Sequence, residues 1–312
     1  MGKSKPDRPL DPGARSTRVT AHFLSRDAGP SVRSMAAETL DGLTAVVTGA
    51  SSGVGAAAAR QLAARGASVV VVGRAVTRTR AVADEVGGTA LPADFARFSE
   101  VRELAQHLIS RNPRIDILVN NAGVTSPKHQ TTPDGHELTV QVNFLSPFLL
   151  TSLLQEKLLR APSALVINTG SSLYRFGKLD PDDLDQNRRR YAQMRSYNAS
   201  KLASVLHAAE INRRAPDTMT AVAFHPGTVR SGLDRDSALI TAAKASRIGR
   251  RLTQSPEEGA EPIIKIATTD RGKLRNVFYN RLEPEPLRAP AADPDLAARL
   301  WQRAHELTHA PA

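Results

Sequence analysis

Short apolar runs alternate with longer amphipathic stretches along most of this 312-residue chain. Runs rich in Val, Ile, Leu and Ala predict strands at residues 44–48, 68–72, 89–93, 115–119, 164–168 and 220–224. We expect one further strand at 276–279. Because these runs are short and rich in β-branched side chains, they favour buried strands over fragments of helix.

The stretches between these runs show the apolar period of helices. They lie at residues 54–65, 76–86, 99–110, 134–160 and 196–214. Gly66 and Gly87 follow two of them, and glycine commonly ends a helix. Repeated strand–helix alternation is typical of a parallel sheet with helices on both faces. The sequence therefore predicts an α/β fold, a single-domain Rossmann-like doubly wound parallel sheet of about seven strands.

Residues 1–34 do not share this pattern. They are rich in Arg, Pro, Ser and Gly, and seven Lys or Arg against three Asp give them a net charge of +4. This composition predicts a disordered basic tail. The tail is either a regulatory arm or an extension that is not native, and we place the folded Rossmann-like domain at 35–312.

Charge and cysteine content exclude several classes of protein. The chain has a net charge of +11, but the charge outside the tail is spread thinly, with no dense basic run. We therefore expect a general attraction for small anionic ligands and no binding of nucleic acid. The absence of cysteine excludes disulfides, thiolate zinc sites and cysteine nucleophiles.

Metal and membrane partners are not expected either. None of the eight histidines falls in a spacing that suits a metal ligand set. No apolar stretch approaches the roughly 20 residues that cross a bilayer. We expect no catalytic metal, no membrane span and a cytoplasmic location.

The first predicted strand runs into a glycine-rich turn, T-G-x-x-x-G-x-G, which leads into a helix. Such a turn lets the backbone approach a pyrophosphate, which the N–H groups and dipole of the helix N-terminus then bind. The alternative is a tight turn whose small residues serve packing alone. The expected cofactor contacts here are Gly49, Ser51, Ser52, Gly53, Val54 and Gly55.

The end of the second strand indicates which dinucleotide binds. An acidic side chain there would bind the ribose 2′-hydroxyl of NAD, but this strand is followed by Gly73 and Arg74. A guanidinium can bind a 2′-phosphate through two hydrogen bonds. The pattern favours NADP(H) over NAD(H). Arg74 can instead be a solvated residue at a helix start, and Arg78 or Arg80 can share either role.

Tyr197 and Lys201 form a Y-x-x-x-K pair within a predicted helix, where a spacing of four places both on one face. A free tyrosine has a pKa of about 10, and a nearby ammonium lowers it toward the range useful for proton exchange. A second match, Tyr174 with Lys178, directly follows a strand and contains Gly177. A long helix is not expected there, so the Tyr197 pair is preferred.

These features occur in a fixed order, together with N-N-A-G at 120–123, serines after the fifth strand and a Pro-Gly turn at 226–227. The set resembles the short-chain dehydrogenase/reductase (SDR) family over roughly residues 41–310. The long separation between Ser171 and Tyr197, and the segment ending at Trp301, resemble the retinol dehydrogenase and protochlorophyllide reductase branch.

The resemblance implies hydride transfer between a nicotinamide and a carbonyl or alcohol. Tyr197 would be the acid and base, and Lys201 would lower its pKa and bind the nicotinamide ribose. Ser171, which aligns better than Ser172, would orient the substrate oxygen, and Asn143 would support a water-linked proton path. The implied further cofactor contacts are Asp94, Phe95, Asn121, Ala122, Gly123, Tyr197, Lys201, Pro226, Gly227 and Val229.

Several alternatives stay open. Asp94 can cap the following helix, Asn143 can be a polar residue satisfied locally, and His225 is expected to have no catalytic duty. A regulator that binds the cofactor without turnover is the alternative function. We expect the substrate to be a bulky apolar carbonyl compound, and residues 173–196 and 230–258 would set this preference. Helix faces at 134–160 and 196–214 could pair subunits in a homodimer or homotetramer.

Overall fold

The computed structural model describes residues 39–188, 190–229, 253–274 and 277–311. The predicted N-terminal tail and most of the predicted substrate segment 230–258 lie outside these described residues.

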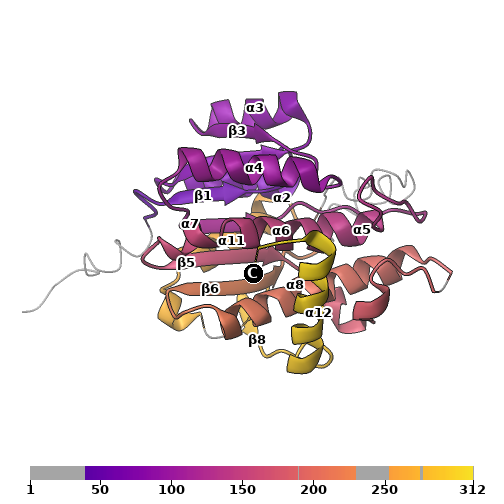
Figure 1. Ribbon diagram of the computed structural model, residues 1–312. Helices are drawn as coiled ribbons and strands as arrows, with labels where there is room; N and C mark the ends of the chain where they lie inside the picture. Colours follow the sequence, from indigo (N-terminus) through magenta and orange to yellow (C-terminus); the bar gives the residue numbers. More distant parts are fainter. Residues whose placement is uncertain (1–38, 189, 230–252, 275–276, 312) are drawn as a thin grey trace, which may run out of the picture.

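One sheet organises the described chain, in the order β3-β2-β1-β4-β5-β6-β7-β8 (Figure 1). Its strands are β1 (Thr44–Val47), β2 (Ser68–Gly73), β3 (Thr89–Pro92), β4 (Ile117–Asn120), β5 (Ala164–Thr169), β6 (Met219–His225), β7 (Phe278–Asn280) and β8 (Glu283–Glu285). All neighbouring pairs are parallel except β7 and β8. The predicted doubly wound parallel sheet is confirmed.

The count of about seven strands was one too low, because β8 was not foreseen. Its three residues, Glu-Pro-Glu, have no apolar period that could predict a strand. The chain reverses at Arg281, which has a φ of 57°. The Asn280 side-chain amide then donates a 2.7 Å hydrogen bond to Glu285, so the strand depends on partners rather than on its own composition.

Helices cover both faces of the sheet. One face carries α4 (Phe98–Arg111), α6 (Ser146–Leu153) and α8 (Gln193–Arg214), and the other carries α2 (Gly53–Ala63), α3 (Val76–Glu85) and α11 (Pro256–Thr268). Along β5, Val166 packs with the first set and Ile167 with the second. Both faces are buried, which is why the strands appear in the sequence as nearly continuous apolar runs.

The C-terminal helix α12 (Pro294–Thr308) adds a further layer across α6 and α8 (Figure 1). The ring of Trp301 packs edge-on against Phe148 at 4.9 Å, and the Arg214 guanidinium lies 5.1 Å from its centroid. This helix occupies part of the outer surface of α6 and α8, where subunit pairing was expected. A homodimer or homotetramer stays a prediction.

The single helix expected at 134–160 is wrong. The structure divides this stretch into α5 (Leu138–Val140), a π-turn η1 (Gln141–Leu145), α6 and α7 (Gln155–Leu159). Helix α5 begins only at 138 because the Glu137 carboxylate caps it, accepting from the N–H groups of Thr139 and Val140 at 3.0 and 2.9 Å. The π-turn contains Asn143, and such turns often occur at functional sites.

Candidate active site

Because seven of the strands are parallel, the turns after β1, β4, β5 and β6 meet at one edge of the sheet. Thr48 joins two of these turns. Its hydroxyl accepts hydrogen bonds from the N–H groups of Asn121 at 2.9 Å and Ala122 at 3.0 Å, and donates one to Val119. The glycine-rich turn is therefore joined to the N-N-A-G turn by the threonine that begins the T-G-x-x-x-G-x-G motif.

The glycine-rich turn leaves no room for a side chain at Gly49 or Gly55. Gly49 has a φ of 66°, and a Cβ there would lie 2.7 Å from the Cα of Ala122. A Cβ on Gly55 would lie 2.5 Å from the Gly49 carbonyl oxygen. Gly53, with a φ of 59°, instead faces open space at the start of α2, and the Ser52 side chain does not cap that helix. This cradle of backbone N–H groups at a helix N-terminus fits a pyrophosphate.

The end of β2 shows why an acidic residue is absent. A Cβ on Gly73 would lie 2.8 Å from the Thr79 hydroxyl and 2.9 Å from the Cβ of Ser51. No carboxylate side chain fits at that position. The next residue, Arg74, is exposed just before α3 and has no hydrogen bond or ion pair within the described chain.

The turn after β3 corrects one expectation. Asp94 does not cap a helix, because α4 begins after Arg97; its carboxylate accepts a 3.0 Å hydrogen bond from the N–H of Ala96 instead. The N–H of Phe98 donates to Asp134 at 2.8 Å. Phe95 belongs to the buried core, so an adenine at this turn would meet its backbone and the Asp94 side chain.

Tyr197 and Lys201 lie on α8, as the spacing predicted. The Lys201 ammonium donates a 2.7 Å hydrogen bond to the carbonyl of Thr169 and lies 5.7 Å from the centroid of the Tyr197 ring. Lys201 is 4% exposed, and burial lowers its pKa to about 8. A cation held here favours the tyrosinate form of Tyr197.

Asn143 faces the same point from the π-turn. A Cβ on Gly123 would lie 3.4 Å from Oδ1 of Asn143 and 3.8 Å from Nζ of Lys201. The Asn143 amide accepts from the N–H of Val124 at 2.7 Å and donates to Val124 and to Ser200, each at 3.0 Å. Its partners come from two other elements, so the alternative that Asn143 is satisfied within its own helix is wrong.

Ser171 is separated from the end of β5 by Gly170 and caps the short helix η2 (Ser172–Phe176), its hydroxyl accepting from the N–H of Leu173 at 3.2 Å. Ser171 is buried, whereas Ser172 is the first residue of η2 and only partly buried. The competing Tyr174 is fully buried against Phe278, with ring centroids 4.7 Å apart. Its Y-x-x-x-K match therefore lies on a 3₁₀ turn and not on a long helix.

The turn after β6 completes the edge. Gly227 has a φ of 89° and packs directly against the side chain of Gln254. The backbone N–H of Gln254 donates a 2.8 Å hydrogen bond to the carbonyl of Thr228. Burial, followed by the positive charge of Arg281, lowers the pKa of His225 to about 4. His225 is then neutral near pH 7, and the absence of a catalytic role for it stays a prediction.

Three groups that support this arrangement were given no role in the sequence analysis. Thr48 is the threonine of the T-G-x-x-x-G-x-G motif, so its hydroxyl was a detectable signal. The Thr169 carbonyl, which receives Lys201, is a backbone group and has no residue-type signature. Ser200, which holds Asn143, sits inside the Tyr197–Lys201 motif, but its direction depends on how α8 packs.

Within the described residues, no group of three or more His, Cys, Asp or Glu could hold a metal ion. In the same part of the chain, no helix is both long enough and apolar enough to span a membrane.

Comparisons with known proteins agree with this geometry. The family described as short chain dehydrogenase matches residues 43–239. A Streptomyces sp. (strain C5) protein named as a daunorubicin C-13 ketoreductase, DnrU, is 41% identical over 84% of this chain and 91% of its own length. Human retinol dehydrogenase 13 is 34% identical over 86% of this chain and 85% of its own length.

Among solved structures, an uncharacterised protein from Mycobacterium paratuberculosis superposes with a TM-score of 0.71 at 29% identity, covering 88% of this chain and 97% of that one. The fold and the site define a dehydrogenase/reductase that acts on alcohol or carbonyl groups of small molecules with a nicotinamide cofactor. The chain belongs to the short-chain dehydrogenase/reductase family and is similar to its retinol dehydrogenase-like branch.

Replacing Lys201 by Met tests the buried cation. Between pH 8 and 10.5 the unfolded chain holds a proton that folded Lys201 has lost, so this residue makes stability rise with pH across that window. We expect the free energy of unfolding of the wild type, relative to Lys201→Met, to rise by up to about 3 kcal/mol across it. Urea denaturation of the cofactor-free protein at several pH values measures this.

Lys265→Met is the matched control, because the exposed Lys265 also donates to a backbone carbonyl, that of Leu282 at 2.6 Å. Its stability curve should run parallel to that of the wild type. If the curve of unfolding free energy against pH for Lys201→Met also ran parallel to that of the wild type, the environment of Lys201 would not favour its neutral form.

Proposed function

We propose that this protein is an NADP(H)-dependent oxidoreductase that interconverts a carbonyl and an alcohol, with Tyr197 as its acid and base. One observation carries the proposal. The buried Lys201 ammonium is held by the Thr169 carbonyl beside the Tyr197 ring, and it faces the same point beside Gly123 as Asn143. The cation and the phenol come from α8 and the amide comes from η1, and apolar packing gives no reason for polar groups of these two elements to face one point.

The chemistry follows from these positions. The nicotinamide, when bound, supplies a hydride to the carbonyl carbon of the substrate in the reducing direction. Tyr197 gives its phenolic proton to the carbonyl oxygen, which becomes the hydroxyl of the product alcohol. Lys201 stabilises the tyrosinate left behind, and the Ser171 hydroxyl donates a hydrogen bond that orients the same oxygen. In alcohol oxidation each proton moves in the opposite direction.

Asn143 acts by positioning. Its amide is committed to Val124 and Ser200, so it holds the backbone beyond Gly123 against α8. We assign it the support of a water that connects Lys201 with solvent and returns the proton to Tyr197.

Tyr197→Phe should abolish turnover while NADPH still binds, because only the exchangeable proton is removed. A loss of at least 1,000-fold in kcat is expected, on the order of a general acid's contribution. NADPH oxidation with a panel of aldehydes and ketones gives the rate, and fluorescence titration gives the affinity.

Tyr174→Phe is the control. Its hydroxyl is buried without a partner, and it is the other tyrosine that has a lysine four residues on. Wild-type turnover in the Tyr197→Phe variant would refute the assignment. If the wild type bound NADPH but reduced no member of the panel, the alternative of a regulator without turnover would be favoured.

The choice of NADP(H) rests on the end of β2. Gly73 excludes the carboxylate that would bind the NAD ribose, and Arg74 is exposed next to the start of α3. An unpaired guanidinium at this place suits a 2′-phosphate. Arg78 is exposed one turn further on and can assist.

Arg74→Ala should raise the KM for NADPH by roughly 10- to 100-fold, because the variant loses a charge-assisted hydrogen bond to the 2′-phosphate. The KM for NADH, which lacks the 2′-phosphate, serves as the control within the same variant and should hardly change. An equal rise for both cofactors would mean that Arg74 supports the fold of the turn and not the phosphate.

An apolar, bulky carbonyl compound is the proposed substrate class. Phe176 on η2 is 71% exposed and Met194 in the first turn of α8 is 53% exposed. Ser171 caps the start of η2, and α8 contains Tyr197. Exposed apolar side chains beside a site favour an apolar ligand. The names of the two relatives, a daunorubicin C-13 ketoreductase and a retinol dehydrogenase, support this class.

Phe176→Ser should lower kcat/KM for polycyclic or long-chain ketones by about 10-fold, the cost of losing one aromatic contact, and leave small polar ketones unaffected. Ile109→Ser is the matched control, since Ile109 is an exposed apolar residue on α4. If small polar ketones gave the higher kcat/KM in the wild type, the proposed substrate class would be abandoned.

A further inference from the structure

Gln193 and Thr125 form a polar pair beside the candidate active site. Gln193 is the first residue of α8, and its side-chain nitrogen donates a 3.2 Å hydrogen bond to the Thr125 hydroxyl. Thr125 follows Val124, whose backbone is held by the Asn143 amide. The polar pair thus joins the loop after β4 to the helix that carries Tyr197.

The spacing along α8 places Gln193 on the same face as Tyr197 and Lys201. Residues 193, 197 and 201 are four apart, so their side chains share one face of the helix. Helical side chains lean toward the N-terminus of their helix. Lys201 does so, because its ammonium lies 5.7 Å from the centroid of the Tyr197 ring. By the same rule the Tyr197 phenol leans over the turn that begins at Gln193, so the polar pair borders the phenol on the side opposite to Lys201.

The polar pair retains capacity for further hydrogen bonds. A glutamine side chain has two N–H donors and an acceptor oxygen, and a threonine hydroxyl has one donor. Within the described chain, the side-chain oxygen of Gln193 and the hydroxyl hydrogen of Thr125 have no partner. Both residues are partly exposed, so a small molecule can reach them. A neighbouring acceptor and donor suit a ligand hydroxyl, which gives one hydrogen bond and receives another.

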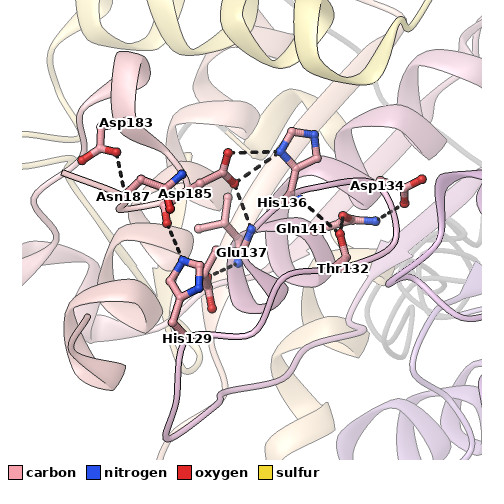
Figure 2. A network of polar contacts seen from close by, with 10 residues as sticks. His129, Thr132, Asp134, His136, Glu137, Gln141, Asp183, Asp185 and Asn187 are labelled. Atoms are coloured by element: carbon pink, nitrogen blue, oxygen red, sulfur yellow. Dashed lines mark hydrogen bonds and ion pairs between the residues drawn. The ribbon is translucent and has the colours of Figure 1, made fainter. Parts of the chain in front are cut away.

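Other contacts hold the loop after β4 against the inserted segment between η2 and α8 (Figure 2). The Asp185 carboxylate accepts from the N–H of Glu137 at 2.9 Å, and Nε2 of His129 lies 3.0 Å from the Asp185 carbonyl oxygen. The Tyr191 hydroxyl donates to the carbonyl of Ser126 at 2.8 Å. The loop is therefore fastened without the polar pair, and groups that are fixed in advance bind a ligand at a smaller entropic cost.

We propose that the polar pair sets substrate specificity by binding a hydroxyl on the carbon next to the substrate carbonyl. The inference rests on the proposed function, because it names the substrates of that same site. The Gln193 oxygen accepts a hydrogen bond from this hydroxyl, and the Thr125 hydroxyl donates one to it. Tyr197 binds the carbonyl oxygen from the next turn of α8, about 6 Å along the helix, so two oxygens on neighbouring carbons are bound at once. The substrate class is then an α-hydroxy ketone with an apolar body.

The matched probes are α-hydroxyacetophenone and propiophenone, which differ only by a hydroxyl in place of a methyl group. The ratio of their kcat/KM values with NADPH measures selectivity, and their intrinsic reactivities cancel when variants are compared. Gln193→Leu and Thr125→Val remove the polar groups at similar size. Each should lower the ratio by about 10-fold, because one hydrogen bond to the substrate is lost. Thr125→Ser keeps the hydroxyl and should keep the wild-type ratio.

Gln130→Leu is the control for loosening of the loop. Gln130 is an exposed glutamine of the same loop and donates to the Ser126 hydroxyl at 2.7 Å. Its replacement disturbs the loop without removing a group of the polar pair, so the ratio should stay at the wild-type value.

A binding measurement separates this proposal from the proposed function, because it needs no turnover. Both ketones are titrated into the NADP⁺-loaded full chain and followed by ligand-observed NMR. Gln193→Leu should weaken the affinity for α-hydroxyacetophenone, relative to that for propiophenone, by about 10-fold. If this shift occurred while the wild type reduced neither ketone, the polar subsite would stand and the proposed function would fail.

Two outcomes would overturn the specificity proposal and leave the proposed function intact. One is a selectivity ratio that is the same in the wild type, Gln193→Leu and Thr125→Val. The other is an equal fall of the ratio in Gln130→Leu, because the polar pair would then act only through the position of the loop.

Discussion

The parallel register of the central strands is the constraint on which the rest of this structure depends. It brings the turns after β1, β4 and β5 to one edge, where each turn leaves backbone groups that must find partners. The Thr48 hydroxyl and the amide of Asn121 provide them, and Asn120 joins β4 to β5 through a 3.0 Å hydrogen bond to Asn168. With the turns fastened to one another, the Thr169 carbonyl has a fixed place for the Lys201 ammonium.

A buried polar face of α8 fixes the rotation of that helix. Ser196 donates to the Glu137 carboxylate at 2.6 Å, Ser200 accepts from the Asn143 side chain, and Ser204 donates to the carbonyl of Asn143 at 3.4 Å. Turning α8 would leave Glu137 and Asn143 buried without these partners, which is costly. The direction in which Tyr197 and Lys201 point is therefore set by serines that take no part in the proposed chemistry.

The same polar face of α8 connects the candidate active site with the segment inserted before α8. Glu137 caps α5 and bonds Ser196, while its backbone N–H binds Asp185 of the inserted segment. The inserted residues are thereby held against α8. A segment that resembled a branch-specific insertion in the sequence is physically a layer packed beside the helix that carries Tyr197 and Lys201.

The sequence by itself determined the strand–helix alternation, the glycine-rich turn and the placement of Tyr197 and Lys201 on one helix, because apolar period, glycine requirement and helical spacing are local properties. It did not determine the break in the helix at 134–160, the strand β8 or the place of Asp94, since these depend on hydrogen bonds between segments distant in the chain. Only the tertiary structure decided that Asn143 faces Lys201 and that Gln186 is buried without a partner. Whether a polar side chain is satisfied is a property of its neighbours in space, and no pattern along the chain contains it.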